Sequence, residues 1–471
     1  MKKIYLFDSS KKEKVEFVSQ EENKVSIYIC GPTVYDDSHL GHARSAIVFD
    51  LLHRILKTNG YDVKMAKNFT DIDDKIINKV KQTGQSIQEI TSYYIDLYKK
   101  DMDILNILPN SFEPKATQNI ENMIDMVEEL ITTDKAYILD DGVYLDTSKD
   151  KLYGEISHRL SDENSQARVQ SNIEKKDSKD FAIWKFFPEN EIGYETSFGY
   201  GRPGWHIECS AMIDRYLASK DKPYAIDIHG GGADLLFPHH ENEACQTRCA
   251  TNQELAKYWI HNGFVNIDGQ KMSKSLGNSF FLKDALKTYS GESIRFYMLN
   301  THYRSNLNFN DDDLLSSKKR LDKIYRLKKR AYGLSYDNFK SKEIGEFKTK
   351  LLEALNDDMN TSVALALIDQ FVSDTNEKLD KEPKNKNLKK SLLVIIDIIN
   401  DLFGIGGTDA YQYFQFGVEG KIKETLELLI QKREMAKQNK EFAISDKIRD
   451  ELKDMGIALM DTPNGTVWER I

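Results

Sequence analysis

Val25-Ser26-Ile27-Tyr28-Ile29-Cys30-Gly31-Pro32 is the stretch of sequence that decides the fold. Its β-branched and aromatic residues predict a buried strand, and the Gly-Pro pair ends that strand. From Ala43 to Leu56 apolar residues recur at helical spacing, and Val63 to Phe69 has the composition of a second strand. A strand, a helix and a strand in this order predict a parallel α/β sheet.

The pattern is interrupted and then resumes further along the chain. The region from about Pro109 to Tyr200 is charged and poorly periodic, with a polar stretch from Ser161 to Asp180, and we interpret it as an insertion into the α/β domain. Tyr224 to Ile228 is again strand-like and runs into His229-Gly230-Gly231-Gly232. The α/β domain therefore consists of two halves.

The last third of the chain predicts a different architecture. Long amphipathic segments from about Tyr289 to Phe403 predict helices. Gly404-Ile405-Gly406-Gly407-Thr408 predicts a linker, and a last helix and a short β-like end, Ile457 to Trp468, close the chain.

Composition limits the classes of protein that need to be considered. A chain of 471 residues suggests about three domains, and its net charge of −9 argues against indiscriminate nucleic-acid binding. No apolar run approaches the ~20 residues that cross a bilayer, and Asp8 comes too early for a secretory signal, so we expect a cytoplasmic protein without a membrane partner. Four cysteines in so long a chain predict metal ligands or buried thiols rather than a disulfide framework.

Two short motifs have the chemistry to handle a nucleoside triphosphate. His39-Leu40-Gly41-His42 lies between the first strand and the first helix, where free backbone N–H groups and the helix dipole favour phosphate. Gly41 permits close approach of a nucleotide, and both imidazoles can donate to phosphate oxygens. Lys271-Met272-Ser273-Lys274-Ser275 follows an expected hairpin turn, and its two lysines can close over a triphosphate. Either motif alone is also compatible with a solvated surface.

The two motifs in this order resemble the signature pair of class I aminoacyl-tRNA synthetases. Leu40 replaces the isoleucine of the family's His-Ile-Gly-His, an apolar exchange at similar volume. The resemblance assigns His39 and His42 to the phosphates in the transition state, and Lys271 and Lys274 to the departing pyrophosphate.

A third set of residues has the chemistry of metal ligands. His239 and Glu243 are four residues apart and share one helix face, and Cys30 and Cys209 supply two thiols. Two thiolates, one imidazole and one carboxylate are suitable ligands for Zn²⁺. Cys245 and Cys249 have the same four-residue spacing, so spacing alone leaves both possibilities open.

The sequence around these residues resembles cysteinyl-tRNA synthetases, a resemblance that covers nearly the whole chain. In that family the segments around Cys30, Cys209 and His239 hold zinc, whereas Cys245 and Cys249 match no ligand and are expected to pack between helices. Asn68 to Lys75 agrees with the same family. The resemblance places Gly31, Thr70 and Trp205 at the cysteine pocket. Asp234 follows the Gly-rich end of a strand, where open α/β sheets bind nucleotides, and is a candidate nucleotide contact beside His39, Gly41, His42 and Lys274.

The resemblance implies a cysteine–tRNA ligase that uses ATP with Mg²⁺, one Zn²⁺ per chain, L-cysteine and tRNA(Cys), and we expect a monomer. The implied fold is α/β: a Rossmann-type parallel-sheet catalytic domain with an insertion, followed by an α-helical bundle domain and a small C-terminal mixed α/β module. The expected parts are the first catalytic half (1–108), the insertion (109–200), the second catalytic half (201–280), a stem-contact region (281–315), a helical anticodon-binding domain (316–403) and a C-terminal anticodon-recognition module (404–471).

Two later segments are candidates for RNA contact. Ser316 to Arg330 contains eight basic residues and one acid, a composition suited either to tracking phosphates or to a solvated helix face. Trp468 can stack on an unpaired base or can anchor the C-terminus by packing.

Two rival functions remain open from the sequence. One is a ligase that joins cysteine to an amino sugar in mycothiol synthesis, which shares the catalytic half but lacks the long segment that this chain has from about Asn306. The other is a catalytically silent RNA-binding relative, against which the intact Lys271 to Ser275 motif and the intact metal ligands argue.

Overall fold

The structure, a computed structural model, describes residues 2–159, 175–267, 270–271, 280–462 and 465–470. The chain forms two compact units. It leaves the first unit and returns to it twice, so neither unit is continuous in sequence. The first unit comprises Met1–Lys283, Thr301–Phe309 and Leu355–Asn360, and the second comprises Asp284–Asn300, Asn310–Ala354 and Thr361–Ile471.

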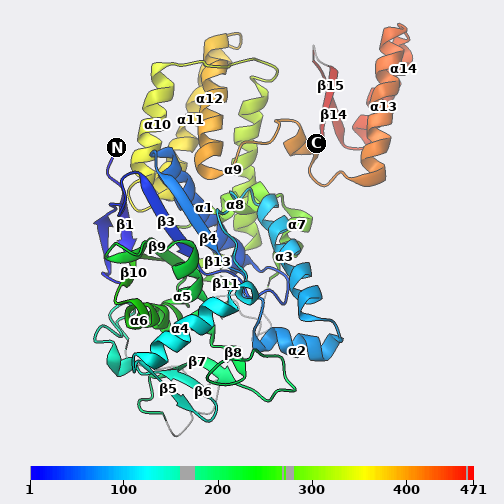
Figure 1. The fold of residues 1–471 in the computed structure, drawn as a ribbon. Helices are drawn as coiled ribbons and strands as arrows, with labels where there is room; N and C mark the ends of the chain where they lie inside the picture. The colour runs from blue at the N-terminus through cyan, green and yellow to red at the C-terminus, as the bar shows by residue number, and fades with distance from the viewer. Residues whose placement is uncertain (1, 160–174, 268–269, 272–279, 463–464, 471) are drawn as a thin grey trace. The chain divides into compact units, whose positions relative to one another are not determined.

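The centre of the first unit is a parallel sheet of four strands in the order β10–β9–β3–β4 (Figure 1). Ile29, at the end of β3, pairs with Lys67 of β4 and with Gly230 of β9. The carboxyl ends of these strands therefore meet at one edge of the sheet, and the α/β fold predicted from the sequence is confirmed. The strands are β3 (Lys24–Ile29), β4 (Asp62–Lys67), β9 (Tyr224–Gly232) and β10 (Glu254–Asn262).

Helix α1 (Leu40–Thr58) is the crossover between β3 and β4. Ala43, Ile47, Leu51 and Ile55 are spaced by four residues and all are buried, so one face of the helix packs on the sheet. The helix gives way to Gly60, whose φ of +96° suits a residue without Cβ.

The expected insertion contains its own antiparallel sheet, in the order β5–β6–β7–β8. Val143, Ile183 and Trp184 are fully buried in its core, into which α4 packs Met123 and Val127. Most of the polar stretch that begins at Ser161 lies outside the described residues. Helices α2 (Asp74–Thr83) and α3 (Ile87–Ile104) precede the expected insertion, and β8 (Gly201–Pro203) lies just beyond its expected end. Its other elements are η1 (Ala116–Gln118), α4 (Ile120–Thr132), β5 (Ala136–Leu139), β6 (Gly142–Leu145), η2 (Thr147–Lys149) and β7 (Phe181–Phe186).

Two further helices, α5 and α6, complete the core on the sheet. Met212 of α5 and Ala244 of α6 are fully buried in one cluster with Tyr28 and Ala66 from the strands. The remaining elements of the first unit are β1 (Tyr5–Asp8), β2 (Glu13–Glu16), α5 (Trp205–Tyr216), the π turn η3 (Leu236–His240), α6 (Glu241–Thr251), β11 (Val265–Ile267), β12 (Gln270–Lys271) and β13 (Leu307–Phe309).

The short segment 355–360 ties distant parts of the first unit together through Asp358. Its carboxylate accepts hydrogen bonds from the Phe7 backbone at 2.9 Å, the Tyr303 hydroxyl at 2.6 Å and the Arg304 guanidinium at 2.9 Å. Beside it, the Tyr5 N–H donates to the Asn356 carbonyl at 2.7 Å. Residues far apart in sequence thereby share one buried acceptor.

The second unit is mainly helical, as the sequence predicted. The expected linker is buried in its first part and exposed at its end: Gly404 caps α12 with φ +66° and Ile405 is fully buried, whereas Gly407 and Thr408 are exposed. The expected last helix is two helices, α13 and α14, which build a separate small core with a two-stranded hairpin. The elements are α7 (Leu282–Thr288), α8 (Gly291–Leu299), α9 (Asp311–Lys329), α10 (Lys342–Leu355), α11 (Thr361–Lys381), α12 (Lys386–Phe403), η5 (Gln412–Gln415), α13 (Gly420–Gln438), α14 (Phe442–Asp454), β14 (Ile457–Thr462) and β15 (Gly465–Arg470).

Within the described part of the chain, no helix combines the length and the apolar character needed to cross a bilayer.

Candidate active site

The metal-ligand candidates and Thr70 gather at the carboxyl edge of the central sheet. Cys30 directly follows β3, and Thr70 follows β4. Cys209 lies in the first half of α5, His239 lies in the π turn, and Glu243 lies in the first turn of α6. Four segments far apart in sequence thus converge because parallel strands end at the same edge.

Cys30, Cys209, His239 and Glu243 form a cluster in which the ligand atoms all lie within 4.8 Å of one another. Cys30 Sγ lies 3.8 Å from Cys209 Sγ and 3.6 Å from Glu243 Oε1. His239 Nε2 lies 3.7 Å from Cys209 Sγ and 2.8 Å from Glu243 Oε1. All but Cys30 are almost completely buried. Two sulfurs, one nitrogen and one oxygen around a common point fit the donor set of a zinc site.

A second group of ligand atoms overlaps with the first. Cys30, His229, His240 and Glu243 also lie within 4.8 Å of one another. His229 Nε2 lies 2.7 Å from Glu243 Oε2, and His240 Nδ1 lies 2.8 Å from His261 Nε2. This group offers one sulfur rather than two, and zinc favours thiolates. His229 is better placed to hold the outer oxygen of Glu243, as a residue behind a metal ligand does.

The charges of the first cluster stabilise one another. Burial disfavours the charged form of Glu243, but the His239 and His229 imidazoles hold its pKa well below the usual range. Burial likewise opposes a charge on His239, but Glu243 and Cys209 raise its pKa to about 10. A hydrogen bond from Cys30 lowers the pKa of Cys209 to about 6, whereas burial raises the pKa of Cys30 itself. Cys209 and Glu243 are therefore favoured as anions beside a positively charged His239, while Cys30 is favoured as the neutral thiol.

Gly31 lies where the segments that follow β3 and β4 contact each other. Its N–H donates to Asn68 Oδ1 at 2.8 Å, and a Cβ at this position would lie 1.6 Å from the Asn68 carbonyl oxygen. The backbone N–H of Thr70 donates to the Pro32 carbonyl at 3.2 Å, and its hydroxyl donates to Glu208 Oε2 at 3.1 Å. Gly31 and Thr70 are thus brought together, with a buried wall of polar groups behind them.

Trp205 lies against the metal-ligand candidate His239. The two rings are stacked with centroids 3.9 Å apart and planes 16° apart, and Trp205 keeps 40% of its surface exposed. On the other side, His206 Nδ1 lies 2.8 Å from His239 Nδ1. Because these two nitrogens share a hydrogen bond, His239 presents Nε2 to the cluster.

The first motif builds the N-terminus of α1 with its own histidines. His39 Nδ1 accepts from the backbone N–H of Gly41 at 3.1 Å and of His42 at 3.4 Å, and His42 Nδ1 accepts from the His39 N–H at 3.3 Å. The rings stack with centroids 3.7 Å apart. Since each Nδ1 is an acceptor, the proton of each neutral ring is on Nε2, which makes Nε2 the donor for an anionic ligand.

Phe280 and Phe281, which follow the second motif along the chain, lie against the start of α1. The Leu40 N–H donates to the Phe280 carbonyl at 3.2 Å, and His39 forms a bridge with Phe281. The backbone of Lys271 lies in β12, while Lys274 lies outside the described residues.

Asp234 lies just beyond the end of β9, at the same edge of the sheet. A Cβ added to Gly232 would lie 2.5 Å from Asp234 Oδ1, so the glycine leaves room for this carboxylate. The position is compatible with the expected nucleotide contact.

Cys245 and Cys249 lie away from this edge, in the core formed with the insertion. They are 0% and 7% exposed, and within the described residues neither belongs to a group of ligand atoms. Their four-residue spacing therefore serves helix packing.

The basic run Ser316 to Arg330 forms most of α9, and the structure pairs many of its cations within the second unit. Lys318 bonds Asp322 at 3.0 Å, and Arg320 bonds Asp369 at 2.6 Å. Lys319, Lys323 and Arg326 remain exposed, so only part of this run presents positive charge. Trp468 is 6% exposed in the small C-terminal core, which favours the packed anchor over base stacking.

Sequence reasoning gave no role to several residues that shape the site. In the sequence, His229 only marks the end of a strand, Asn68 only begins the run to Lys75, and no motif singles out Glu208. His229 alternates with apolar residues on β9, and a buried histidine in that position indicates a partner nearby. The contacts of Asn68 and Glu208 cross between segments, so no local pattern marks them.

Comparison with known proteins agrees with this geometry. Residues 16–319 match the family model described as tRNA synthetases class I (C) catalytic domain, and residues 350–406 match the DALR domain. A protein of Aliarcobacter butzleri named Cysteine–tRNA ligase is 63% identical over 100% of both chains. The chain belongs to the cysteine–tRNA ligase family.

Other members of the cysteine–tRNA ligase family match over almost the same length. The proteins of this name from Nitratiruptor sp. and Helicobacter pylori are 58% and 55% identical, each over 99% of this chain and 100% of the relative. The family is one of class I synthetase enzymes, as the two motifs indicated.

Solved structures place the family within a wider fold. A Mycobacterium tuberculosis methionyl-tRNA synthetase bound by methionyl-adenylate superposes with a TM-score of 0.61 at 14% identity, over 81% of this chain and 92% of that one. A ternary complex of an Agrobacterium radiobacter LeuRS with tRNA and LeuAMS gives 0.60 at 13% identity, over 86% and 87%. These similarities concern the fold.

Proposed function

We propose that this chain activates L-cysteine with ATP and transfers it to the 3′-terminal adenosine of tRNA(Cys). Membership of the family supports the reaction as a whole. The observation that carries the details is the meeting of two sites at one sheet edge: a Cys, Cys, His, Glu cluster and a helix start with two histidine donors. The first suits a thiol substrate, and the second suits a triphosphate.

The reaction has two steps. A carboxylate oxygen of cysteine attacks the α-phosphorus of ATP, and the bond to pyrophosphate breaks, which leaves cysteinyl-adenylate. The 2′-hydroxyl of the terminal adenosine, the position that class I resemblance implies, then attacks the acyl carbon and releases AMP. Phosphoryl-type transfers of this kind depend mainly on positioning and charge stabilisation.

Each residue of the first motif has a defined part in this proposal. Nε2–H of His39 and of His42 donates to the phosphates as charge develops, and Gly41 keeps the helix start open to ATP. Lys271 and Lys274 stabilise the departing pyrophosphate, and Asp234 contacts the nucleotide. Mg²⁺ accompanies ATP.

Cys30, Cys209, His239 and Glu243 would hold one Zn²⁺, which would supply a borderline-soft Lewis acid that prefers a thiolate to a hydroxyl. Gly31 and Thr70 line the cysteine pocket beside these ligands. Trp205, stacked on His239, covers the pocket on its exposed side. His229 orients Glu243 from behind.

The later parts of the chain belong to the same proposal. The stem-contact region (281–315), the helical domain (316–403) and the C-terminal module (404–471) would serve tRNA(Cys) binding by a monomer. The DALR match over residues 350–406 supports the helical part.

The decisive experiment makes the same Cys→Ser substitution at a candidate metal ligand and at a cysteine outside the cluster. Cys209→Ser is expected to lose zinc and cysteine-dependent pyrophosphate exchange, whereas Cys245→Ser, buried in helix packing, is expected to keep both. Metal content by mass spectrometry and exchange with serine as competitor give separate readouts. Full zinc in a Cys30→Ser, Cys209→Ser double variant would rule out the assignment.

A second experiment addresses the loop. Lys274→Ala is expected to slow adenylate formation about a hundredfold, roughly 3 kcal/mol of transition-state stabilisation, with little change in cysteine binding. Rapid-quench measurement of adenylate checks this. A rate near that of the wild type would remove Lys274 from its role.

Charging of total tRNA separates the rival functions. Transfer of cysteine to tRNA(Cys) supports the proposal. Pyrophosphate exchange with cysteine but transfer only to an amino sugar would favour the ligase of mycothiol type, and absence of exchange would favour a silent RNA-binding protein.

A further inference from the structure

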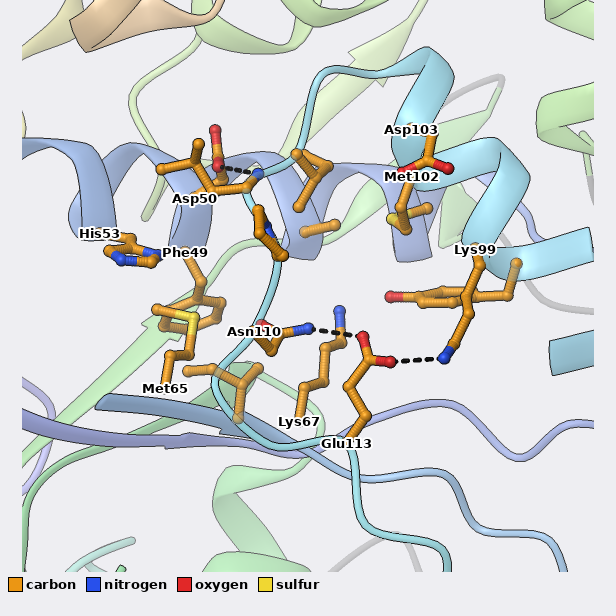
Figure 2. A pocket seen from close by; sticks show the side chains of 16 residues that line it. Phe49, Asp50, His53, Met65, Lys67, Lys99, Met102, Asp103, Asn110 and Glu113 are labelled. Carbon is orange, nitrogen blue, oxygen red and sulfur yellow. Dashed lines mark hydrogen bonds and ion pairs between the residues drawn. The ribbon is translucent and has the colours of Figure 1, made fainter. Parts of the chain in front are cut away.

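A cavity of about 240 Å³ lies in the first unit on the other face of β4 from the metal-ligand cluster (Figure 2). Met65 and Lys67 of β4 line it, together with residues of α1, of α3 and of the segment after α3. Ala66, between them on the strand, packs instead in the core that contains Cys209. Because successive side chains of a strand point to opposite faces, the cavity and the cluster are two separate sites.

Lys67 points into this cavity, as Figure 2 shows. The residue is 9% exposed, so more than nine-tenths of it is buried. Within the described part of the chain its ammonium group has no hydrogen bond or ion pair, and its contact is with the Tyr98 ring, 5.2 Å from the centroid. A buried ammonium without an acceptor is costly, so the position calls for a ligand that accepts.

Tyr98, which also lines the cavity, is a second donor in the same condition. Its hydroxyl is buried and has no hydrogen-bond partner among the described residues. Tyr98 and Lys67 lie against each other, so one acceptor group can reach toward both donors. Two neighbouring donors without acceptors in one cavity indicate an anionic oxygen ligand.

Two of the three carboxylates in the cavity wall, Asp50 and Glu113, are engaged by other groups, and the third, Asp103, is exposed to solvent. Glu113 pairs with Lys99 at 2.7 Å and accepts from Asn110 Nδ2 at 3.1 Å, as Figure 2 also shows. Asp50 bonds Arg54 Nε at 2.7 Å and the Leu108 N–H at 2.7 Å. These carboxylates therefore do not neutralise Lys67, and the remaining positive charge is available to a ligand.

The rest of the lining is suited to an apolar body. Burial lowers the pKa of His53, so this ring is neutral at pH 7. Apolar groups make up most of the remaining wall: Ile29, Ala46, Phe49, Met65, Met102 and Leu108. We propose that this cavity binds a small molecule with an apolar body and one carboxylate, and that Lys67 and Tyr98 donate to the carboxylate.

The test titrates the intact protein with benzoate and 1-naphthoate, followed by calorimetry and by the shift of the unfolding temperature. Ligands of this size are expected to bind in the millimolar range or tighter. Lys67→Met keeps the length of the side chain without its charge and is expected to weaken binding at least about tenfold, the loss of roughly one charged hydrogen bond. Tyr98→Phe is expected to weaken it several-fold. Lys64→Met, at an exposed position of the same strand, is the matched control and is expected to bind as the wild type does.

Four results would overturn the proposal. The first is no saturable binding of either carboxylate up to about 10 mM, beyond the range expected for such ligands. The second is equal binding of the neutral amides, benzamide and 1-naphthamide, and the third is wild-type affinity in Lys67→Met. The fourth is displacement of the probe by cysteine or by an adenylate analogue, which would place the probe in the active site. If Lys67→Met without ligand unfolds at a lower temperature than the wild type, its loss of binding is attributed to packing. The binding affinity of Tyr98→Phe, which lacks only one oxygen atom, then tests the proposal.

Discussion

At the scale of the residue, Gly31 shows how closely the segments that follow β3 and β4 approach each other. The backbone of Asn68 occupies the space in which any side chain at position 31 would lie. Both residues are neighbours of the proposed cysteine pocket, through Cys30 on one side and Thr70 on the other. A displacement of a few tenths of an ångström at this contact therefore changes the pocket as well as the core.

Gly31→Ala is expected to lower stability by about 1–3 kcal/mol or more through overpacking, and to reduce cysteine activation far more than ATP binding. Unfolding in urea and pyrophosphate exchange measure the two effects. Gly345→Ala is the control, because position 345 lies exposed in α10 with open space around a Cβ. It should stabilise the protein by about 0.5–1 kcal/mol. Similar effects at both positions would contradict the close-approach argument.

The types of residue at the site could be predicted from the sequence, but their partners could not. Cys30, Cys209, His239 and Glu243 have side chains that are uncommon outside metal sites when several occur near strand ends. The role of His229 depends on Glu243 of another element, and that of Asn68 depends on the backbone at Gly31. Such contacts arise only after the chain has folded.

At the scale of the element, helix α1 begins with a side chain that has two tasks. Nδ1 of His39 caps the helix, and the proposal gives Nε2 to a phosphate. Because asparagine also caps helices well, substitution can separate the two tasks.

His39→Asn is expected to keep the stability of the wild type within a few tenths of a kcal/mol, while His39→Ala is expected to lose about 1 kcal/mol. Both are expected to slow adenylate formation to a similar degree. Urea unfolding and rapid-quench kinetics give the two numbers. If His39→Asn formed adenylate at the normal rate, the histidine would be a cap and nothing more.

The hairpin of β14 and β15 depends on an ion pair that acid should break. A hydrogen bond from Arg433, with Lys437 beside it, holds the pKa of the Asp461 carboxyl well below its usual range. A lowered pKa contributes stability above the unfolded value of about 3.9, and this contribution is lost as the pH falls through the folded pKa. Asp461 is 39% exposed, so solvent screens part of the effect, but Arg433 is 3% exposed and would be left without its partner.

Asp461→Asn is therefore expected to cost about 1–2 kcal/mol of local stability at pH 7 and progressively less below about pH 4. Hydrogen exchange of the hairpin amides, corrected for the intrinsic rate at each pH, measures this difference. Asp450→Asn, an exposed position on α14, should show no such dependence. If the stability difference between Asp461→Asn and the wild type increased as the pH fell, the lowered pKa of Asp461 would be contradicted.

Elements with strong periodicity could be predicted, and those without it could not. The buried face of α1 is visible in the sequence, whereas β5 and β6 have four residues each and show little alternation. The sequence predicts one last helix, since no glycine or proline separates α13 from α14. The break is at Lys440, which takes a left-handed φ of +63°.

At the scale of the whole molecule, the core of the C-terminal module indicates where the chain can be truncated with the least damage to the rest of the second unit. Leu426, Ile430, Ile448, Leu452, Ile457 and Trp468 pack together. The preceding segment contacts this module through Gln415 Nε2, which donates to the Trp468 carbonyl at 2.9 Å, but it also packs on α9, where Tyr413 stacks on Tyr325 with centroids 3.7 Å apart. A cut after Val418 keeps this stacked pair, while a cut after Phe403 removes Tyr413 and the buried Ile405.

Deletion of residues 419–471 is expected to leave cysteine-dependent pyrophosphate exchange within about twofold and to reduce tRNA charging at least about tenfold, roughly 1.4 kcal/mol of lost RNA affinity. Deletion of 404–471 is expected to destabilise the rest of the second unit. Both rates and the unfolding temperature should be measured for each protein. Equal loss of exchange and charging in a folded 419–471 deletion would exclude a separate RNA role for the module.

The return of residues 355–360 to the first unit has a consequence for the order of synthesis. The Phe7 N–H and the Asp358 carboxylate that accepts from it are 351 residues apart. A ribosome needs on the order of tens of seconds to make that length of chain. During that time the strand at Tyr5 can pair with β2 but lacks its contact with Asn356, and Tyr303 and Arg304, once made, still lack the Asp358 carboxylate that accepts from both. Most of the first unit is synthesised first. Its last segment, residues 355–360, is synthesised only after several helices of the second unit.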